Sequence, residues 1–318
     1  MLSERGFASQ IYSSVEELRK LADDVHAGAR YTVTRVKKRD GSLRQIYKPD
    51  PLLAMALKKA NEFLTARPLP TIDHVYGFVR GRSIVDNARQ HLSKPVVIRI
   101  DLKDFFESIS TSRVILSLEQ HLDFGPEAAQ LAGRLLTVNG TTPVGFSTSP
   151  YLSNLVFRET DIAVASMALQ NGLAFTRYVD DMNFSGIPKR TFIEDVTEVL
   201  SRFGWSVNKR KTQIMRRGGK QYVTGLSVSD PKRPRIPPNL KHRMRWKLHM
   251  IEKFGYEQYM TGFGGEDCND HPRKLLGLAR YIALVEPALG IDLLDRLNRQ
   301  LDDSWYSEQE EDSWLGYR

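Results

Sequence analysis

The segment Tyr178-Val-Asp-Asp181 constrains this chain more than any other stretch of it. Apolar or β-branched residues flank the two adjacent carboxylates on both sides, from Phe175 to Phe184. This pattern predicts a β-hairpin with the acidic pair at its tip. Carboxylate oxygens suit Mg²⁺, so the tip is a candidate metal site. The alternative is a plain polar turn, because Asp is common in turns.

An earlier acidic segment favours the metal site over the plain turn. Val96–Ile100 is a short β-branched strand that runs directly into Asp101. A strand that brings one Asp to a hairpin bearing two is the layout of a two-metal phosphoryl-transfer site. We therefore predict that Asp101, Asp180 and Asp181 are both the catalytic residues and the metal ligands. The expected cofactor is a pair of Mg²⁺ ions, with Mn²⁺ as a substitute.

Charge points to a polyanionic partner. The 318 residues carry a net charge of +8 and a pI near 9.4, which makes nucleic acid the leading candidate. Eight Lys and Arg residues and one acid lie between Lys232 and Lys253, whereas six acids and no base lie between Asp302 and Asp312. A solvated helix face and a solubilising terminus are the ordinary explanations of these two runs.

The same composition limits the setting of the protein. An apolar content of 41% supports a packed core. No apolar run approaches the roughly 18–20 residues of a membrane helix, and the N-terminus has no signal-peptide core. The single cysteine, Cys268, excludes an intramolecular disulfide framework. We therefore expect a cytoplasmic protein without a membrane partner.

Periodicity predicts a sheet-based catalytic core followed by a basic helical unit, which is an α+β fold. The expected strands, besides Val96–Ile100 and the acidic hairpin, are Tyr31–Lys37, Leu43–Tyr47 and Tyr222–Val228, the first two joined by a turn at Arg39–Ser42. The expected helices are Arg5–Tyr12, Ser14–His26, Pro51–Ala66, Ser110–Gln120, Pro126–Thr137, Ser149–Gln170, Phe192–Phe203, Asn239–Phe254, His271–Leu284 and Gly290–Asp302.

Several residues outside the acidic trio are candidates for binding a nucleotide. Arg44 and Lys48 lie in a basic hairpin that suits a triphosphate or a template backbone. The backbone N–H of Asp104 can meet the triphosphate, and the ring of Phe106, beside Phe105, can fill the space that a ribose 2′-OH needs. A core aromatic is the alternative for Phe106.

A loop and a lysine complete the candidate nucleotide site. Gly145 would let the backbone approach a ligand, and Ser149 would begin a helix whose first N–H groups face the site. An ordinary loop-to-helix junction remains open for both residues. Lys211 can reach the pyrophosphate, although it can also be a common surface lysine.

These segments, in this order, resemble the motifs of reverse transcriptases. The four matching stretches are Asp101-Leu-Lys-Asp-Phe-Phe106, Val144–Pro150, Tyr178–Asp181 and Asn208–Thr212. The resemblance implies a right-hand polymerase fold with fingers, an antiparallel palm and a helical thumb. It divides the chain into N-terminal helices and fingers at 1–95, a palm at 96–230 that includes fingers residues at about 112–145, and a thumb with an acidic tail at 231–318.

Within that family the chain resembles the bacterial retron enzymes. Asn87-Ala-Arg-Gln-His91 and Val223-Thr-Gly225 match two short elements that those enzymes carry. The resemblance implies that a cognate structured noncoding RNA binds around Asn87, His91, Val223, Thr224 and Gly225 and on the basic thumb. Arg243, Arg245 and Trp246 are the thumb candidates, and a helix-core role is the alternative for Trp246. By spacing alone, Asn87 and His91 share a helix face and can equally bond a nearby loop.

The resemblance also implies a product and partners. A retron enzyme uses dNTPs to copy its RNA from a 2′-OH into a short branched single-stranded DNA, in antiphage defence and usually with a separate effector protein.

This sequence departs from the pattern at Val144, where most retron enzymes have Gln, and at Phe146, where they have a small residue. The departure keeps open a defence reverse transcriptase outside the retrons. A retired RNA-binding scaffold is the non-enzymatic alternative, which the three intact aspartates disfavour.

Overall fold

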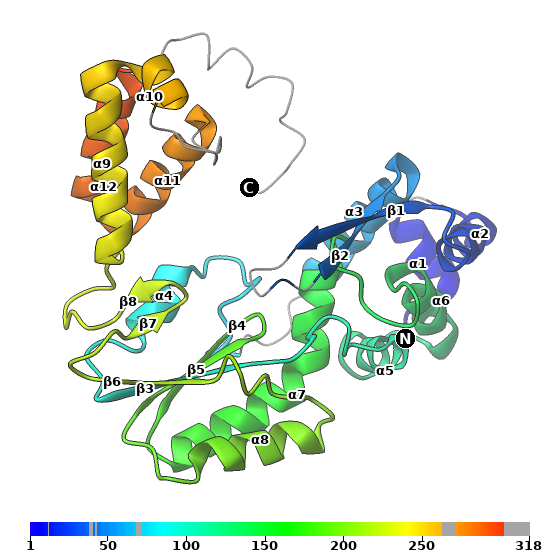
Figure 1. The fold of residues 1–318 in the computed structure, drawn as a ribbon. Helices are drawn as coiled ribbons and strands as arrows, with labels where there is room; N and C mark the ends of the chain where they lie inside the picture. The colour runs from blue at the N-terminus through cyan, green and yellow to red at the C-terminus, as the bar shows by residue number, and fades with distance from the viewer. Residues whose placement is uncertain (12, 38–40, 42, 68–71, 263–270, 302–318) are drawn as a thin grey trace.

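A computed structural model describes residues 1–11, 13–37, 41, 43–67, 72–262 and 271–301. It has three groups of elements (Figure 1): an N-terminal group of helices with a hairpin, a sheet backed by helices, and a separate C-terminal group of helices. Among these residues, no helix has the length and apolar character needed to cross a bilayer. Parts of three expected features lie outside the described ranges: the turn after Lys37, Cys268 and the acidic tail.

The N-terminal group is built from α1 (Glu4–Gln10), α2 (Val15–His26), the hairpin β1 (Tyr31–Lys37) and β2 (Leu43–Pro49), and α3 (Pro51–Thr65). The side chains of Ser14 and Glu17 form a reciprocal capping box at the start of α2. The Asp50 side chain caps α3 by accepting a hydrogen bond from the N–H of Leu53. Against α1 and α2 lies α6 (Pro126–Leu136), and α5 (Thr111–Leu122) packs on α6 (Figure 1).

The palm sheet has four antiparallel strands in the spatial order β4 (Ala174–Tyr178), β5 (Asp181–Gly186), β3 (Val96–Asp101) and β6 (Gln213–Arg216). Two helices, α7 (Ser149–Gln170) and α8 (Phe192–Arg202), cover one face of it (Figure 1). Phe184 stacks on Phe175 at 4.9 Å between ring centroids and meets Phe192 of α8 at 5.1 Å. This apolar layer supports the strands whose ends carry the three aspartates.

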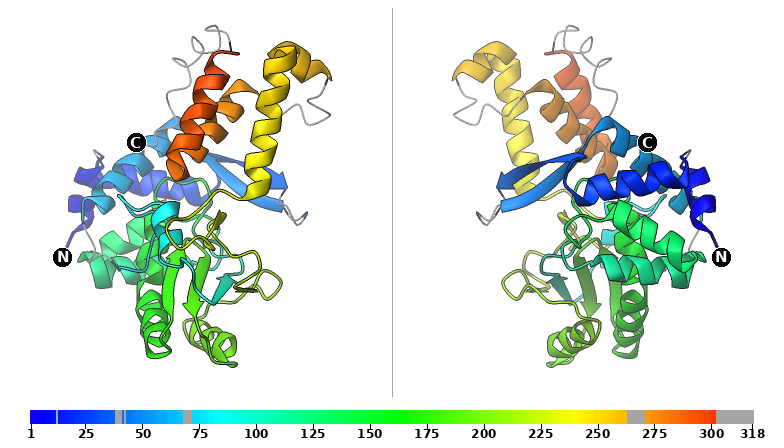
Figure 2. Two further views of the ribbon diagram at one scale, coloured as in Figure 1. Left: turned by 90° about the vertical axis from the view of Figure 1, so that its left-hand side faces the viewer. Right: turned by 90° about the vertical axis from the view of Figure 1, so that its right-hand side faces the viewer.

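A second hydrophobic core joins the edge of the palm sheet to the C-terminal group of helices. It includes α4 (Ile84–Arg89), the short hairpin β7 (Tyr222–Val223) and β8 (Leu226–Ser227), and the helices α9 (Pro238–Phe254), α10 (Tyr256–Gly262), α11 (Pro272–Val285) and α12 (Pro287–Asn298). Figure 2 shows these helices standing above the sheet. A Cβ on Gly290 would lie 2.1 Å from the backbone nitrogen of Ala283, so this glycine lets α11 and α12 approach closely.

The structure corrects several sequence predictions. The single strand expected at Tyr222–Val228 is two short strands, because Thr224 and Gly225 both adopt positive φ (46° and 79°) and turn the chain back. The last helix begins at Pro287 rather than at Gly290, and α10 was not expected. The strand β6, which follows Lys211, was not expected either.

Candidate active site

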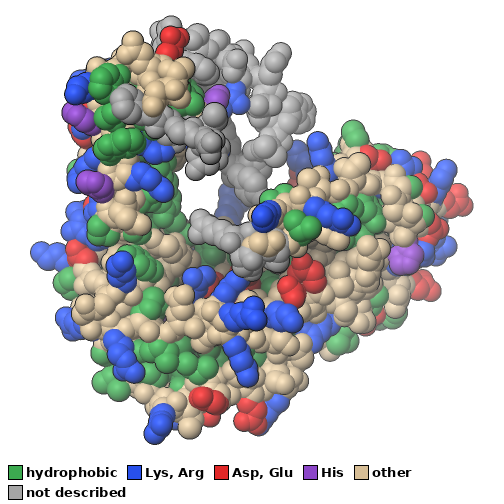
Figure 3. Space-filling model, viewed as in Figure 1, with side chains coloured by type: hydrophobic (Ala, Val, Ile, Leu, Met, Phe, Trp, Pro, Cys, Tyr) green, Lys and Arg blue, Asp and Glu red, His purple; other side chains and the backbone are tan. Residues whose placement is uncertain are grey.

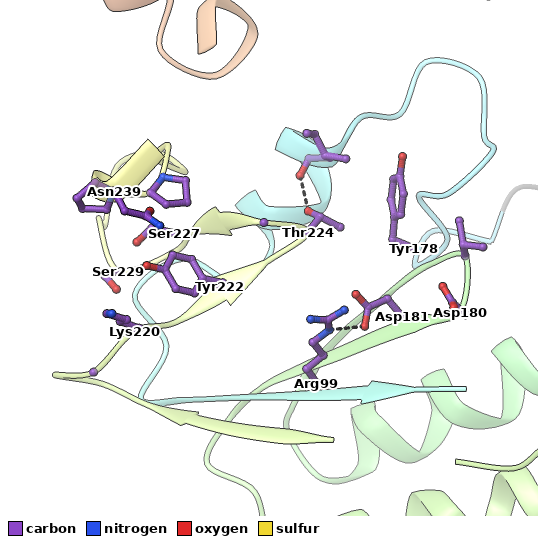
Figure 4. A pocket seen from close by; sticks show the side chains of 16 residues that line it. Arg99, Tyr178, Asp180, Asp181, Lys220, Tyr222, Thr224, Ser227, Ser229 and Asn239 are labelled. Carbon is purple, nitrogen blue, oxygen red and sulfur yellow. Dashed lines mark hydrogen bonds and ion pairs between the residues drawn. The ribbon is translucent and has the colours of Figure 1, made fainter. Parts of the chain in front are cut away.

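The three predicted carboxylates meet at one end of the palm sheet. Tyr178 pairs with Asp181 across the β4–β5 hairpin, so Val179 and Asp180 form its turn, as the sequence predicted. Asp101, the last residue of β3, pairs with Asp181 in register. The N–H of Leu102 donates to the carbonyl of Asp180 (3.0 Å), which fixes the first acidic segment against the turn. Figure 4 shows Asp180 and Asp181 beside each other at this edge.

Two cations are already paired with these carboxylates. Arg99 Nε donates to Asp181 Oδ1 at 2.6 Å (Figure 4). Lys211 Nζ donates to Asp101 Oδ2 at 3.3 Å and lies 3.1 Å from Oδ1. The loop that bears Lys211 is held to β3, because the N–H of Asn208 donates to the carbonyl of Asp101 (2.8 Å). Lys211 therefore belongs to the site, as predicted from its motif, although its partner here is a carboxylate.

Burial makes the negative charge at this edge costly. It raises the pKa of the Asp180 carboxyl, and the neighbouring Asp101 carboxylate raises that pKa further. Burial also raises the pKa of Asp181, an effect that the ion pair with Arg99 opposes. The charges of Lys211 and of Arg44 on β2 act in the opposite direction and lower the pKa of Asp180, but burial has the larger effect.

The donor set fits divalent cations in kind. Asp101 is 4% exposed, and its Oδ1 accepts no hydrogen bond of good geometry from the described residues, although Lys211 Nζ lies 3.1 Å from it. A buried carboxylate oxygen without a hydrogen bond is a ready ligand for a hard cation. The three side chains do not form a metal coordination shell here, since no three His, Cys, Asp or Glu groups among the described residues are close enough to hold an ion. The ion pairs with Arg99 and Lys211 give the physical reason: they orient two of the carboxylates toward protein cations.

Some predicted nucleotide-binding residues are exposed and some are buried. Arg44 and Lys48 are exposed and four residues apart on β2, so they share one face of the strand. Asp104 is exposed and has a positive φ of 44°. Phe106 is half-buried and packs edge-on against Phe105, with ring centroids 5.5 Å apart. All of these except Phe105 remain available to a substrate.

Burial rules out direct side-chain contact with a nucleotide for Phe105 and Ser149. The Phe105 ring is buried between Phe157 and Trp205. The Ser149 side chain is buried and donates to the carbonyl of Pro143 (2.6 Å), so it braces the loop. Gly145 has φ 119°, and a Cβ there would lie 2.2 Å from the carbonyl oxygen of Tyr47. The close backbone approach at this exposed glycine is therefore to β2, and its contact with a nucleotide stays a prediction.

The same correction applies to three predicted RNA contacts. Asn87, His91 and Val223 are fully buried, so their side chains present no surface to RNA. The two ring nitrogens of His91 lie 2.7 Å from the hydroxyls of Ser185 and Thr176, on β5 and β4. Burial lowers the pKa of His91 to about 3, so its ring is neutral. His91 thereby joins the segment after α4 to the strands β4 and β5.

The other predicted RNA-binding residues are accessible. Thr224 and Gly225 line a cavity of about 1070 Å³ that also includes Asp180, Asp181 and Arg99 (Figure 4). Arg243, Arg245 and Trp246 are exposed on α9. Figure 3 shows Lys and Arg side chains along that helix and around the centre of the molecule.

Sequence reasoning missed part of the cavity wall. Arg99, Tyr178, Lys220, Tyr222 and Asn239 line it beside the aspartates. The sequence could have indicated Arg99, because it lies two residues before Asp101 on a strand and so points to the same side of the sheet. The remaining residues come together only through the β7–β8 hairpin and the start of α9.

The family of the chain follows from this architecture together with comparisons to known proteins. Residues 36–279 match the family described as reverse transcriptase (RNA-dependent DNA polymerase). The chain belongs to the reverse transcriptase family, and its fold is the right hand expected from the motifs.

Among its relatives are retron enzymes. It is 32% identical to the retron Mx162 reverse transcriptase of Myxococcus xanthus, over 93% of this chain and 66% of that protein. It is 32% identical to the retron Mx65 reverse transcriptase of the same organism, over 81% of this chain and 62% of that protein. It is 28% identical to the retron Ec86 reverse transcriptase of Escherichia coli, over 89% of both chains. The chain thus spans about two thirds of the length of the two Myxococcus relatives.

Proposed function

We propose that this protein is an RNA-directed DNA polymerase of the retron type. The observation that carries the proposal is the convergence of Asp101, Asp180 and Asp181 from two paired strands, inside a chain of the reverse transcriptase family. The proposed template is a cognate structured noncoding RNA, and the proposed product is a short single-stranded DNA that is primed from a 2′-OH and stays branched to the RNA. Antiphage defence and a separate effector protein are proposals that rest on the resemblance to retron enzymes alone, and a cytoplasmic location is a proposal that rests on the composition of the sequence.

The proposed site chemistry assigns a task to each residue. When bound at the three aspartates, two Mg²⁺ ions would activate the attacking hydroxyl and stabilise the leaving pyrophosphate. Arg44 and Lys48 are exposed cations on one face of β2, and we assign them to the triphosphate. Lys211 would supply positive charge or a proton to the pyrophosphate. The half-buried ring of Phe106 would exclude a ribose 2′-OH.

Primer extension on an RNA template tests the activity. Asp180→Asn and Asp181→Asn each remove one carboxylate charge with little change in volume, and we expect DNA synthesis to fall by at least about a hundredfold. Glu107→Gln is the matched control, since this exposed carboxylate lies in the segment that follows Asp101, has no assigned role and should keep most activity. Full synthesis by both Asp180 and Asp181 variants would remove the polymerase assignment and favour the RNA-binding scaffold.

Bound nucleic acid tests the retron subtype. The protein is purified from cells that carry its native locus, and the extracted nucleic acid is run on a denaturing gel before and after RNase and debranching treatment. A discrete DNA that shifts with both treatments supports a branched RNA–DNA product. Heterogeneous DNA without a branch would move the proposal to a defence reverse transcriptase outside the retrons.

A further inference from the structure

A fully buried ion pair lies directly behind the catalytic turn. Arg177, the residue before Tyr178, donates from Nε to Asp161 Oδ1 (2.7 Å) and from Nη2 to Asp161 Oδ2 (2.6 Å). Both side chains have zero exposure. Burying two charges is expensive, and apolar residues of similar size often serve stability equally well or better. The presence of this pair in the palm core therefore calls for a role besides stability.

The remaining donors of Arg177 point to the turn. Its Nη1 donates to the carbonyl of Val179 at 2.8 Å, and that carbonyl belongs to the peptide bond that leads into Asp180. Val179 has a φ of 61°, which is strained for a β-branched residue. Such backbone strain persists only where the surroundings hold it in place. The guanidinium bond to the Val179 carbonyl is a contact suited to that purpose.

Asn154 extends this network to a second loop. Its side-chain oxygen accepts from Arg177 Nη2 (3.1 Å), and its Nδ2 donates to the carbonyl of Gly77 (2.9 Å). A Cβ on Gly77 would lie 2.5 Å from the backbone nitrogen of Val179, so this loop packs directly on the turn. The next residue, Phe78, carries an exposed ring 6.5 Å from that of Phe106. The network therefore joins the turn to the loop that approaches the proposed nucleotide site.

We propose that Arg177, oriented by Asp161 and shared with Asn154, is a positioning residue that holds the Val179–Asp180 turn in the conformation that Asp180 needs to bind a divalent cation. This inference rests on the proposed function of Asp180 as a metal ligand. Arg177 does not touch the substrate. It acts through the backbone of Val179, and Asp161 keeps the guanidinium in the one orientation that serves the turn.

An apolar replacement of the pair separates positioning from stability. The double variant Asp161→Leu/Arg177→Met removes both buried charges together, so we expect it to unfold at a similar denaturant concentration to the wild type. Its loss of the bond to the Val179 carbonyl should weaken Mn²⁺ binding, measured by electron paramagnetic resonance on the protein without nucleic acid, by about 10- to 100-fold. In primer extension, kcat should fall more than the KM for the primer–template rises.

Two further variants keep the test decisive. Arg177→Lys retains a cation for Asp161 and loses the fork of donors, so it should also weaken Mn²⁺ binding if the double variant does not fold. Thr160→Val is the matched control on the same helix, because it removes a buried hydrogen bond from Trp205 Nε1 (2.9 Å) that does not reach the turn. We expect this control to lower stability and to leave Mn²⁺ binding unchanged.

A glycine at the strained position provides a rescue. Val179→Gly relieves the φ preference that the turn opposes, so adding it to the double variant should recover part of the Mn²⁺ affinity. Wild-type Mn²⁺ binding by a folded double variant or by Arg177→Lys would overturn the positioning role. Loss of the proposed function is a separate result: unchanged Mn²⁺ binding and unchanged DNA synthesis by Asp180→Asn would show that Asp180 is not a metal ligand.

Discussion

Protonation of the buried His91 should make the fold lose stability in mild acid. Its ring nitrogens are both occupied by hydroxyls, and burial holds the pKa near 3 in the folded protein, against a value of 6.5 for the exposed side chain. Below pH 6.5 the unfolded chain therefore binds a proton that the folded chain does not. The stability that neutral His91 contributes is complete above pH 6.5 and is lost as the pH falls toward 3.

The size of this loss follows from the unfolded-state pKa. At pH 5, 1.5 pH units below 6.5, the proton taken up by the unfolded chain is worth about 2 kcal/mol, whereas at pH 7 it is worth only about 0.2 kcal/mol. The result changes little if the folded pKa is 2 or 4, because both lie below the pH of the measurement. His91 alone should thus lower the free energy of unfolding by about 2 kcal/mol between pH 7 and pH 5.

Urea unfolding of the wild type and of His91→Gln, at several pH values from 7 to 5, measures this contribution. The variant should be less stable at pH 7 because one buried hydroxyl loses its partner, at a cost of about 1–3 kcal/mol. The difference between the two proteins should then shrink by about 2 kcal/mol on going to pH 5. His26→Gln is the control, since His26 is exposed at the end of α2. A pH-independent difference between wild type and His91→Gln would refute the reasoning.

Three further outcomes are expected. Phe106→Ala should raise the incorporation of ribonucleotides relative to deoxynucleotides by about tenfold or more, and an unchanged ratio in single-nucleotide extension would return this ring to a packing role. Arg243→Ala combined with Arg245→Ala should weaken RNA binding and reduce the magnitude of its log–log salt slope by roughly 1.5, as a filter-binding titration would show. Arg99→Gln should tighten Mn²⁺ binding to the free protein by about two- to fivefold, since the partly exposed pair with Asp181 competes with the ion. Equal Mn²⁺ affinity in wild type and Arg99→Gln would remove that competition.

Local patterns were sufficient for most elements of the palm. The β-branched run at Val96–Ile100 and the apolar flanks of the Asp180–Asp181 pair predicted β3 and the β4–β5 hairpin, because a strand's alternation and its turn are short-range properties. The turn at Thr224 that divides the expected strand into two was missed, because Val-Thr-Gly is compatible with an extended strand when the cross-strand pairing is unknown. The register that puts Asp101 opposite Asp181 spans 80 residues of chain and became visible only in the structure.

The misassigned residues share a physical reason. Asn87, His91 and Ser149 are polar, and polarity in a sequence suggests a surface that meets a ligand. In the fold these side chains are buried by other segments: the hydroxyls of β4 and β5 receive His91, and the carbonyl of Pro143 receives Ser149. For Gly145 the sequence suggested only a ligand, and it could not show that the carbonyl of Tyr47 occupies the space that the missing side chain leaves. Whether such a side chain is buried or exposed depends on packing between segments far apart in the sequence, and no local sequence pattern indicates that packing.

The departures at Val144 and Phe146 can be understood from the same packing. The carbonyl of Val144 accepts a hydrogen bond from the N–H of Tyr47 (2.8 Å), which is a backbone contact that any side chain permits. The Phe146 ring is buried and lies edge-on to Tyr31 of β1, with centroids 6.4 Å apart. The bulky residue thus anchors the glycine loop to the N-terminal hairpin. We therefore locate its effect in the placement of that hairpin, which carries Arg44 and Lys48, rather than in a direct contact with the primer.

The cations at the site explain how three neighbouring carboxylates can coexist before a metal ion binds. Like charges that are buried together repel, and each would otherwise favour its protonated form. Lys211 beside Asp101 and Arg99 beside Asp181 offset that repulsion from the two flanks, while Asp180, in the strained turn between them, has no such ion pair among the described residues. Its placement then depends on backbone contacts, from Leu102 on one side and through Val179 from Arg177 on the other. The carboxylate without an ion pair among the described residues is thus held through its backbone, by bonds from Leu102 and Arg177 to the carbonyls on either side of it.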